Sequence, residues 1–166
     1  HASDFCYMTS HDKLNVEVTK YSREFYAKRG NYIKTGGLEV ARKGDDERML
    51  ELIRKVGSGK AFGTNAYMIS AKEAKEKFPL LEEDQIQGAM WDPDAGLVTP
   101  RSQKVAGDLV DEAVASGKLK AFANTPATKL LVENGEIKGV ETRKGIIHAD
   151  YVVLCVGIWG NLVSET

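Results

Sequence analysis

The residues best placed to do chemistry lie at the end of an apolar run, residues 151–156, which Gly157 follows. The run is short for a helix and rich in β-branched residues, which favours a buried strand. In open parallel sheets, ligands bind outside the carboxyl ends of strands, and a glycine there lets the backbone approach a ligand closely. Gly157 is therefore a candidate contact for a phosphate or a sugar. The alternative is a core strand that ends in a turn.

A second glycine cluster, G-S-G-K-A-F-G at residues 57–63, has some features of a phosphate-binding loop. Its context argues against that function, because a helix rather than a strand precedes it. Arg54 stands where a P-loop needs its first glycine, and Ala61 replaces the hydroxyl that would hold magnesium. We expect a flexible loop at a helix end. No strand, G-x-G-x-x-G and helix unit occurs anywhere in the sequence.

Composition narrows the class of protein. With 166 residues, 42% hydrophobic and 28% charged, the chain suits an ordinary globular core. A net charge of −1 provides no basic field for nucleic acid or an anionic membrane surface, and no apolar run approaches the ~20 residues of a membrane span. Cys6 and Cys155 lie far apart in sequence, which predicts neither a disulfide scaffold nor a metal site.

Capping residues predict two helices in the first third of the chain. Ser10 or Asp12 can cap a helix that Gly30 ends, and Asp45 can cap the next one. Apolar spacing then predicts the residues of each helix that face the core. These are Leu14, Val18, Tyr21 and Phe25 in the first helix, and Met49, Leu50, Ile53 and Val56 in the second.

Glycine and proline divide the segments that follow. Strand-like residues 32–42 are interrupted by Gly36-Gly37, which indicates a bulge or a place where something packs closely on the backbone. Ser70 and Glu73 form a capping box for a third helix, which Pro79 ends.

The second half contains a strand, a helix and a hairpin. Residues 86–91 are strand-like, and residues 92–96 form a turn. Thr99 is the expected cap of a helix that has Pro100 at its first position and Gly117 at its end. The expected inward residues of this helix are Val105, Leu109, Val110, Ala113 and Val114.

A short strand at residues 119–123 precedes a three-stranded meander. Asn134-Gly135 is the hairpin signature, because both residues tolerate the positive φ of a type I′ turn. Strands are therefore expected at residues 130–133, 137–142 and 146–148.

These elements, in this order, resemble the D-amino-acid oxidase (glycine oxidase-like) family of FAD-dependent oxidoreductases, and within it the dimethylglycine and sarcosine dehydrogenase branch. The motifs that carry the resemblance extend over nearly the whole chain. They are His1-Ala2, G-G-L-E-V-A at 36–41, F-P-L-L at 78–81, G-A-M-W-D-P-D-A-G-L-V-T-P at 88–100, T-P-A-T from Thr125, G-V-E-T from Gly139 and C-V-G-I-W-G from Cys155.

The resemblance implies an α+β internal fragment of a two-domain FAD-dependent oxidoreductase. Residues 1–100 would belong to the mixed-sheet substrate domain. Residues 101–166 would be the returning half of the FAD-binding domain, with its helix, strand, β-meander and final strand. Since the glycine-rich phosphate unit is missing, we expect these residues alone to bind FAD weakly and to lack activity.

The resemblance also implies roles in binding FAD. His1 matches the histidine that bonds the flavin C8 methyl group, although it is equally well explained as an ordinary chain end. Ala127 would offer its backbone N–H and C=O to the adenine edge. Val156 and Gly157 would face the ribose or pyrophosphate. No catalytic base and no metal ligand is assigned, and Trp91 to Asp94 are interpreted as turn and core rather than as an amine cage.

The implied function is flavin-dependent demethylation of a small secondary or tertiary amine, such as dimethylglycine or sarcosine. Two alternatives stay open: another small substrate, such as a D-amino acid or glycerol 3-phosphate, and a non-catalytic α+β interaction module. We expect a cytoplasmic protein, or a mitochondrial-matrix protein in a eukaryote. Self-association is expected if nothing else covers the apolar run at residues 151–156.

Overall fold

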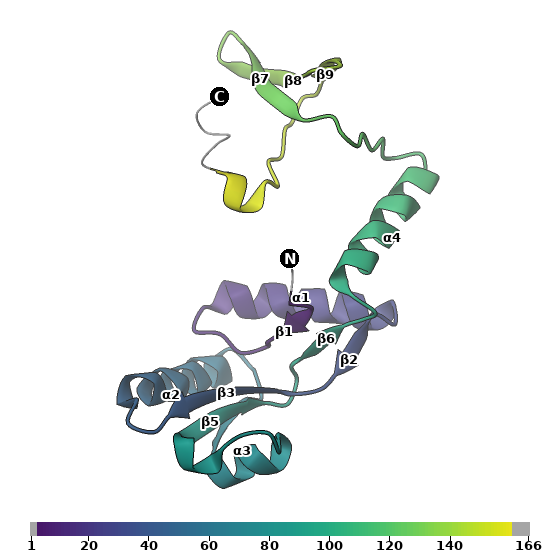
Figure 1. The fold of residues 1–166 in the computed structure, drawn as a ribbon. Helices are drawn as coiled ribbons and strands as arrows, with labels where there is room; N and C mark the ends of the chain where they lie inside the picture. The colour runs from purple at the N-terminus through teal and green to yellow at the C-terminus, as the bar shows by residue number, and fades with distance from the viewer. Residues whose placement is uncertain (1–2, 161–166) are drawn as a thin grey trace. The chain divides into compact units, whose positions relative to one another are not determined.

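The computed structural model describes residues 3–160. The chain forms two compact units, which divide between Glu112 and Ala113 (Figure 1). Helix α4 (Ser102–Ala115) contains the division. The domain boundary expected at residue 100 stays a prediction, because compactness alone does not define the domains of a longer protein.

The first unit contains two antiparallel sheets, each of three strands. One has the order β1 (Phe5–Cys6), β6 (Gly96–Val98) and β2 (Tyr32–Lys34). The other has the order β3 (Gly37–Arg42), β5 (Ile86–Asp92) and β4 (Tyr67–Ile69). The predicted break at Gly36-Gly37 is confirmed, because β2 and β3 belong to different sheets.

Three of the helices begin as their capping residues predict. Asp12 accepts the N–H of Asn15 at the start of α1 (Lys13–Lys28), and Asp45 caps α2 (Asp46–Ala61). Ser70 and Glu73 form the complete capping box of α3 (Ala71–Lys77). A short 3₁₀ turn, η1 (Glu83–Gln85), leads into β5. These are local side-chain to backbone bonds, which explains why sequence alone predicts them.

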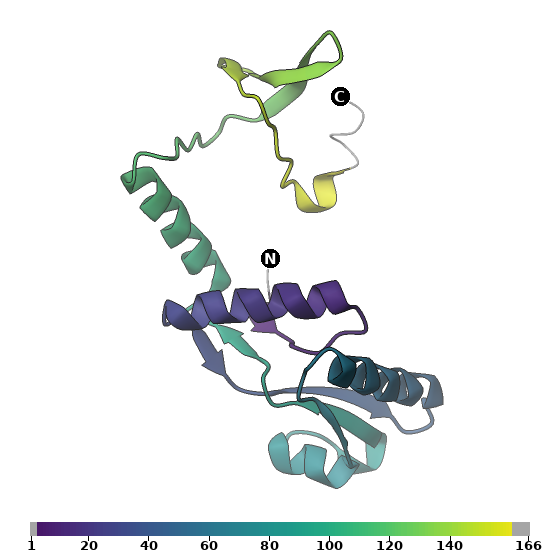
Figure 2. The same cartoon turned by 180° about the vertical axis from the view of Figure 1, so that it is seen from behind.

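Helices α2 and α3 cover opposite faces of the sheet that contains β5 (Figures 1 and 2). Leu52 and Val56 of α2 pack on Met90, whereas Ala74 of α3 packs on Ala89. The inward face predicted for α2 is partly wrong, because Leu50 and Ile53 are exposed and Leu52 is fully buried. The buried stripe is stepped by four and then three residues and ends at Gly59.

The glycines of residues 57–63 do not form the expected flexible loop. Gly57 and Gly59 lie inside α2, which continues to Ala61. A Cβ at Gly59 would lie 2.4 Å from Thr64 Oγ1 and 2.6 Å from Thr9 Cγ2, so the helix passes close to two other segments. Tertiary packing therefore outweighs the low helix propensity of glycine.

The apolar stripe predicted to bury α1 is also wrong. Leu14, Val18 and Tyr21 are 70%, 54% and 74% exposed, and Val16 is the buried residue of the helix. The helix uses a neighbouring face, on which Lys20 donates to the carbonyl of Phe62 (2.9 Å). Apolar periodicity does not reveal this contact, because Lys20 and Phe62 are distant in sequence.

A buried carboxylate joins the N-terminal segment to the end of β5. Asp92 is fully buried, and its Oδ2 accepts the backbone N–H groups of Met8 and Thr9, each at 2.9 Å. Its Oδ1 accepts the N–H of Asp94 at 3.1 Å. Burying a carboxylate is costly unless it is hydrogen-bonded, so this arrangement requires all three donors.

Helix α4 begins differently from the prediction. Thr99 and Pro100 precede the helix, and Asp4 takes the capping role. Asp4 Oδ1 accepts the N–H of Ser102 at 2.8 Å and also bonds the hydroxyl of Ser102. Of the residues expected to face inward, only Val105 is buried.

The second unit contains the predicted meander of β7 (Ala127–Glu133), β8 (Glu136–Thr142) and β9 (Gly145–His148). Asn134 and Gly135 have φ values of 53° and 81°, as the hairpin signature requires. This expectation is confirmed, since it depends on residues adjacent in sequence.

Two expected strands of this unit do not form. Residues 119–123 are irregular, and residues 151–156 are unpaired, with Tyr151 90% and Val153 82% exposed. A turn of 3₁₀ helix, η2 (Gly157–Trp159), follows. A strand needs a hydrogen-bonding neighbour, and in the described part of the chain no strand pairs with residues 151–156.

We predict that Asp92→Ala destabilises the first unit by about 3 kcal/mol, because it leaves two buried N–H groups without an acceptor. Urea unfolding measures the loss. Asp84→Ala, at an exposed position on η1, is the control and should change stability by less than about 0.5 kcal/mol. Equal stability of the two variants would show that Asp92 is not an anchor.

Candidate functional site

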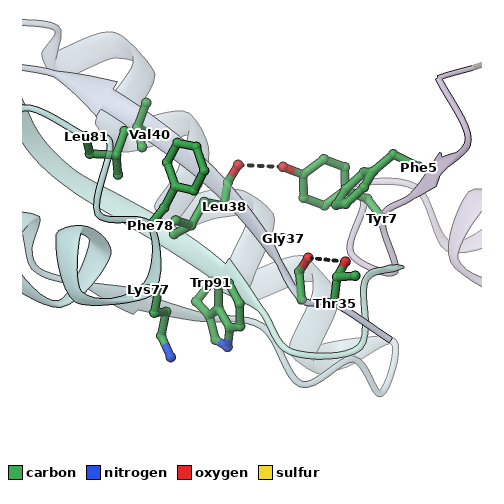
Figure 3. Close-up of a pocket in the computed structure, with 11 residues that line it drawn as sticks. Phe5, Tyr7, Thr35, Gly37, Leu38, Val40, Lys77, Phe78, Leu81 and Trp91 are labelled. Atoms are coloured by element: carbon green, nitrogen blue, oxygen red, sulfur yellow. Dashed lines mark hydrogen bonds between the residues drawn. The ribbon is translucent and has the colours of Figure 1, made fainter. Parts of the chain in front are cut away.

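A cavity of about 570 Å³ in the first unit lies over β3 and β5, beside the end of α3 (Figure 3). Aromatic and aliphatic side chains dominate its lining, and the N-terminal segment contributes two of the aromatic rings. The lining residues are Phe5, Tyr7, Thr35, Gly36, Gly37, Leu38, Val40, Lys77, Phe78, Leu81 and Trp91.

Two glycines allow aromatic rings to lie against the backbone of this cavity. Gly36 has a φ of +73°, and a Cβ there would lie 2.1 Å from the outer edge of the Trp91 ring. A Cβ at Gly37 would lie 2.7 Å from the Phe5 ring. The close packing on Gly36-Gly37 expected from sequence is therefore confirmed, and its partners are aromatic side chains.

Tyr7 is a hydrogen-bond donor in this cavity and not a base. Its hydroxyl donates to the carbonyl of Leu38 at 2.6 Å, and its ring packs edge-on against Phe5 with centroids 4.7 Å apart. The pKa of Tyr7 is raised to about 12. Burial is the largest cause, and the nearby carboxylates of Glu39 and Asp92 add to it. The hydroxyl thus keeps its proton at physiological pH.

Lys77 is the one charged residue among those that line the cavity. Its Nζ lies 4.3 Å from the centroid of the Trp91 ring, which is a cation–π arrangement. Among residues 3–160, no carboxylate, imidazole or thiol lines the cavity. The cavity thus offers apolar surface and one positive charge, and it supplies no acceptor for a substrate proton.

The acidic residues after Trp91 have structural roles, which agrees with their interpretation as turn and core. Asp94 accepts hydrogen bonds from Lys34 and Asn65, both at 2.6 Å, and lies 3.6 Å from Arg23. Sequence reasoning did not place Trp91 in a cavity, since its neighbours there, Lys77 and Phe5, are distant in sequence. Only the Gly36-Gly37 signal pointed to this region.

Three of the residues predicted to bind FAD, Ala127, Val156 and Gly157, belong to the second unit. His1 lies outside the described residues. Ala127 is the exposed first residue of β7, and Val156 precedes Gly157 at the start of η2. Within residues 3–160, no hydrogen bond joins Ala127 to Val156 or Gly157. Their roles stay predictions.

Other kinds of site lack support in the described residues. Residues 3–160 contain no group of His, Cys, Asp or Glu side chains arranged to hold a metal ion. No helix in the same range has the length and apolar character needed to cross a membrane.

Comparison with known proteins defines the class. Residues 3–166 match the model of the FAD-dependent oxidoreductase (DAO) family, and the chain belongs to this family. Its α+β elements are those of part of such an enzyme, and FAD is the cofactor of the family. The fold, the family and the cofactor inferred from the sequence motifs are thus confirmed.

Particular relatives make the comparison more specific. Over 87% of this chain, the sequence is 31% identical to human mitochondrial sarcosine dehydrogenase. Over 90% of this chain, it is 30% identical to the mouse mitochondrial regulatory subunit of pyruvate dehydrogenase phosphatase. The crystal structure of L-proline dehydrogenase from P. horikoshii is 33% identical over 94% of the chain, with a TM-score of 0.81. The chain spans 16% and 17% of the two curated relatives and 42% of the solved one.

The second unit has features that fit a contribution to FAD binding. Gly157 has a φ of +56°, and among the described residues other than its chain neighbours no atom lies within 4 Å of the position that its Cβ would take. Ala127 is exposed, and the pairing of β7 with β8 is irregular between Ala127 and Lys129. Both residues are exposed, and their roles in FAD binding stay predictions.

We predict that Gly36→Ala destabilises the first unit by about 3 kcal/mol and displaces Trp91. An alanine in the left-handed conformation costs roughly 1 kcal/mol. The added methyl group also overlaps the Trp91 ring, and this overpacking costs further stability. Gly30→Ala is the matched control, because Gly30 also has a φ of +73° but has no atom within 4 Å of its Cβ position. Urea unfolding, with Trp91 emission followed in a Trp159→Phe background, compares the two. Equal losses would refute the role of the Trp91 contact.

Proposed function

We propose that this chain supplies part of a flavoenzyme that oxidises a small secondary or tertiary amine, such as sarcosine or dimethylglycine, with loss of an N-methyl group. The observation that carries the proposal is the match to human sarcosine dehydrogenase at 31% identity over 87% of the chain. The chain spans 16% of that enzyme, so activity is proposed for the whole protein.

In this proposal, the second unit holds part of the cofactor. The main chain of Ala127 bonds the adenine edge, and Val156 and Gly157 lie against the ribose or pyrophosphate. His1 provides a covalent tether to the flavin. When bound, FAD supplies the electron-accepting ring, while the protein contributes binding, orientation and electrostatics. Residues 1–100 are proposed as substrate-domain sequence, and residues 101–166 as sequence of the FAD-binding domain.

Two relatives support alternatives. L-proline dehydrogenase is the solved relative at 33% identity, which favours a cyclic secondary amine as a second candidate substrate. The regulatory subunit matches over 90% of the chain, which favours a non-catalytic role as the competing class. Both of these curated relatives are mitochondrial by name, which supports a matrix location in a eukaryote.

A substrate panel tests the proposed reaction. The intact protein, with its bound flavin, is mixed without oxygen with sarcosine, dimethylglycine, L-proline, D-alanine or glycerol 3-phosphate. We expect the N-methyl amines to bleach the visible flavin absorbance fastest. Reduction by D-alanine or glycerol 3-phosphate alone would contradict the proposal. A flavin that none of the compounds reduces, although dithionite does, would favour the non-catalytic class.

The proposed cofactor contacts predict opposite effects for two valine substitutions. In a His1→Ala background, Gly157→Val should abolish flavin retention, because a side chain at this left-handed position would enter the space for the cofactor. Ala127→Val should retain flavin, since its contacts are main-chain. The ratio of flavin to protein absorbance after purification measures occupancy.

Gly117→Val is the control for backbone strain in this experiment. Gly117 has a φ of +74° and also has open space around its Cβ position, but it lies outside the proposed contacts. It should lose stability without losing flavin. Full flavin occupancy in Gly157→Val would show that Gly157 is only a turn residue.

A further inference from the structure

Helix α4 carries the chain across the division between the two units and is poorly buried along its length. The division lies between Glu112 and Ala113, inside the helix. Val105 is the buried residue of the helix, whereas Val110 and Val114 are 43% and 44% exposed. Because packing of an apolar face supplies most of the stability of a helix in a protein, α4 depends on the contacts near its two ends.

The start of α4 is fixed to the N-terminal segment. The carboxylate of Asp4 accepts the N–H and the hydroxyl of Ser102, and it lies 3.4 Å from Nε of Arg101. The carbonyl of Asp4 accepts the N–H of Val98 at 2.7 Å, so backbone and side-chain bonds both hold this residue. The first turn of α4 is therefore anchored.

An ion pair joins the far part of α4 to the end of α1, and it is weak. Arg29 donates to Glu112, and its guanidinium carbon lies 5.5 Å from the centroid of the Phe25 ring. The two side chains of the pair are 26% and 58% exposed, and ion pairs with such exposure contribute little stability. Nε of Arg29 is buried and has no hydrogen-bond partner among residues 3–160. Opening the pair exposes this donor to water, which lowers the cost of opening.

A glycine lies between the anchored start and the ion pair. Gly107 is exposed, and apart from its chain neighbours and the backbone of α4 no described atom lies within 4 Å of its Cβ position, so packing does not require glycine here. Glycine in a helix interior is less favourable than alanine, because its backbone loses more freedom. The ion pair of Lys104 with Asp108 spans Gly107, but it is partly exposed and adds little. Gly107 is thus a point at which the helix can open.

We propose that α4 is a conformational switch, with Gly107 as its hinge and the Arg29–Glu112 pair as its latch. With the latch closed, α4 is the continuous helix of this structure. With the latch open, the helix bends at Gly107, while the Asp4 contact keeps its start in place. The direction in which the chain leaves the first unit then changes. The switch concerns α4 alone and is independent of the proposed reaction.

Hydrogen exchange, measured residue by residue in the intact protein, detects the hinge. A bend at Gly107 breaks the helical hydrogen bonds that cross it, which the N–H groups of residues 108–111 donate. We expect these groups to exchange about threefold faster in Arg29→Gln, as loss of a partly exposed ion pair allows, while residues 106–107 keep the parent rate. Glu112→Gln, at an exposed position, opens the same latch from the other side and should give the same pattern.

Both parts of the switch have a matched control. Lys28→Gln removes a neighbouring charge at the end of α1 and should leave the exchange of α4 unchanged. Gly107→Ala should slow the exchange of residues 108–111 about fourfold, both in the parent and in Arg29→Gln, because alanine favours the helix. Gly57→Ala fills an equally open position inside α2 and should leave α4 unchanged.

Three results would overturn the proposal. Parent exchange rates at residues 108–111 in both Arg29→Gln and Glu112→Gln would mean that the ion pair is not a latch. Equal acceleration at residues 106–107 and 108–111 would indicate loss of the whole helix rather than a bend at Gly107. Unchanged exchange in Gly107→Ala would mean that the glycine is not the hinge.

Discussion

The first unit depends on the buried carboxylate of Asp92. Its bonds to the N–H groups of Met8 and Thr9 cross a sequence separation of more than eighty residues and bring the N-terminal segment to the end of β5. That placement allows Phe5 and Tyr7 to form one wall of the cavity. The same segment carries Asp4, which caps α4. A single buried side chain thus positions the segment that contributes to both features.

The two faces of the sheet that contains β5 serve different purposes. On one face, α2 covers a core that contains Met90. Glu39 of β3 forms ion pairs with Arg48 and Lys55 of α2. On the other, the short helix α3 covers only part of the sheet, and the cavity occupies the surface beside it (Figures 1 and 3). Helix α3 ends before Pro79, and its last residue, Lys77, lines the cavity.

Sequence predicted the features that depend on neighbouring residues. The caps at Asp12, Asp45 and Ser70 and the Asn134-Gly135 turn are bonds or conformations within a few positions, and all are confirmed. The break at Gly36-Gly37 was also foreseeable, although its partner Trp91 was not, because Trp91 of β5 is distant in sequence from Gly36.

Features that depend on distant partners were missed or wrong. Apolar spacing placed Leu14 and Tyr21 in the core, but α1 buries Val16 instead, on the face where Lys20 bonds Phe62. Thr99 was the cap expected from sequence, but Asp4, which is distant in sequence, accepts the N–H of Ser102 at the start of α4. The strand expected at residues 151–156 has the right composition, yet composition cannot supply the hydrogen-bonding neighbour that a strand requires.

Hydrogen exchange at the backbone of Met8 and Thr9 tests the central role of Asp92 most directly. Their N–H groups should exchange as slowly as those of β5, because release from the buried carboxylate requires unfolding of the first unit. Exchange of Met8 and Thr9 at the rate of the irregular residues 119–123, while β5 remains protected, would show that the N-terminal segment is not anchored by Asp92.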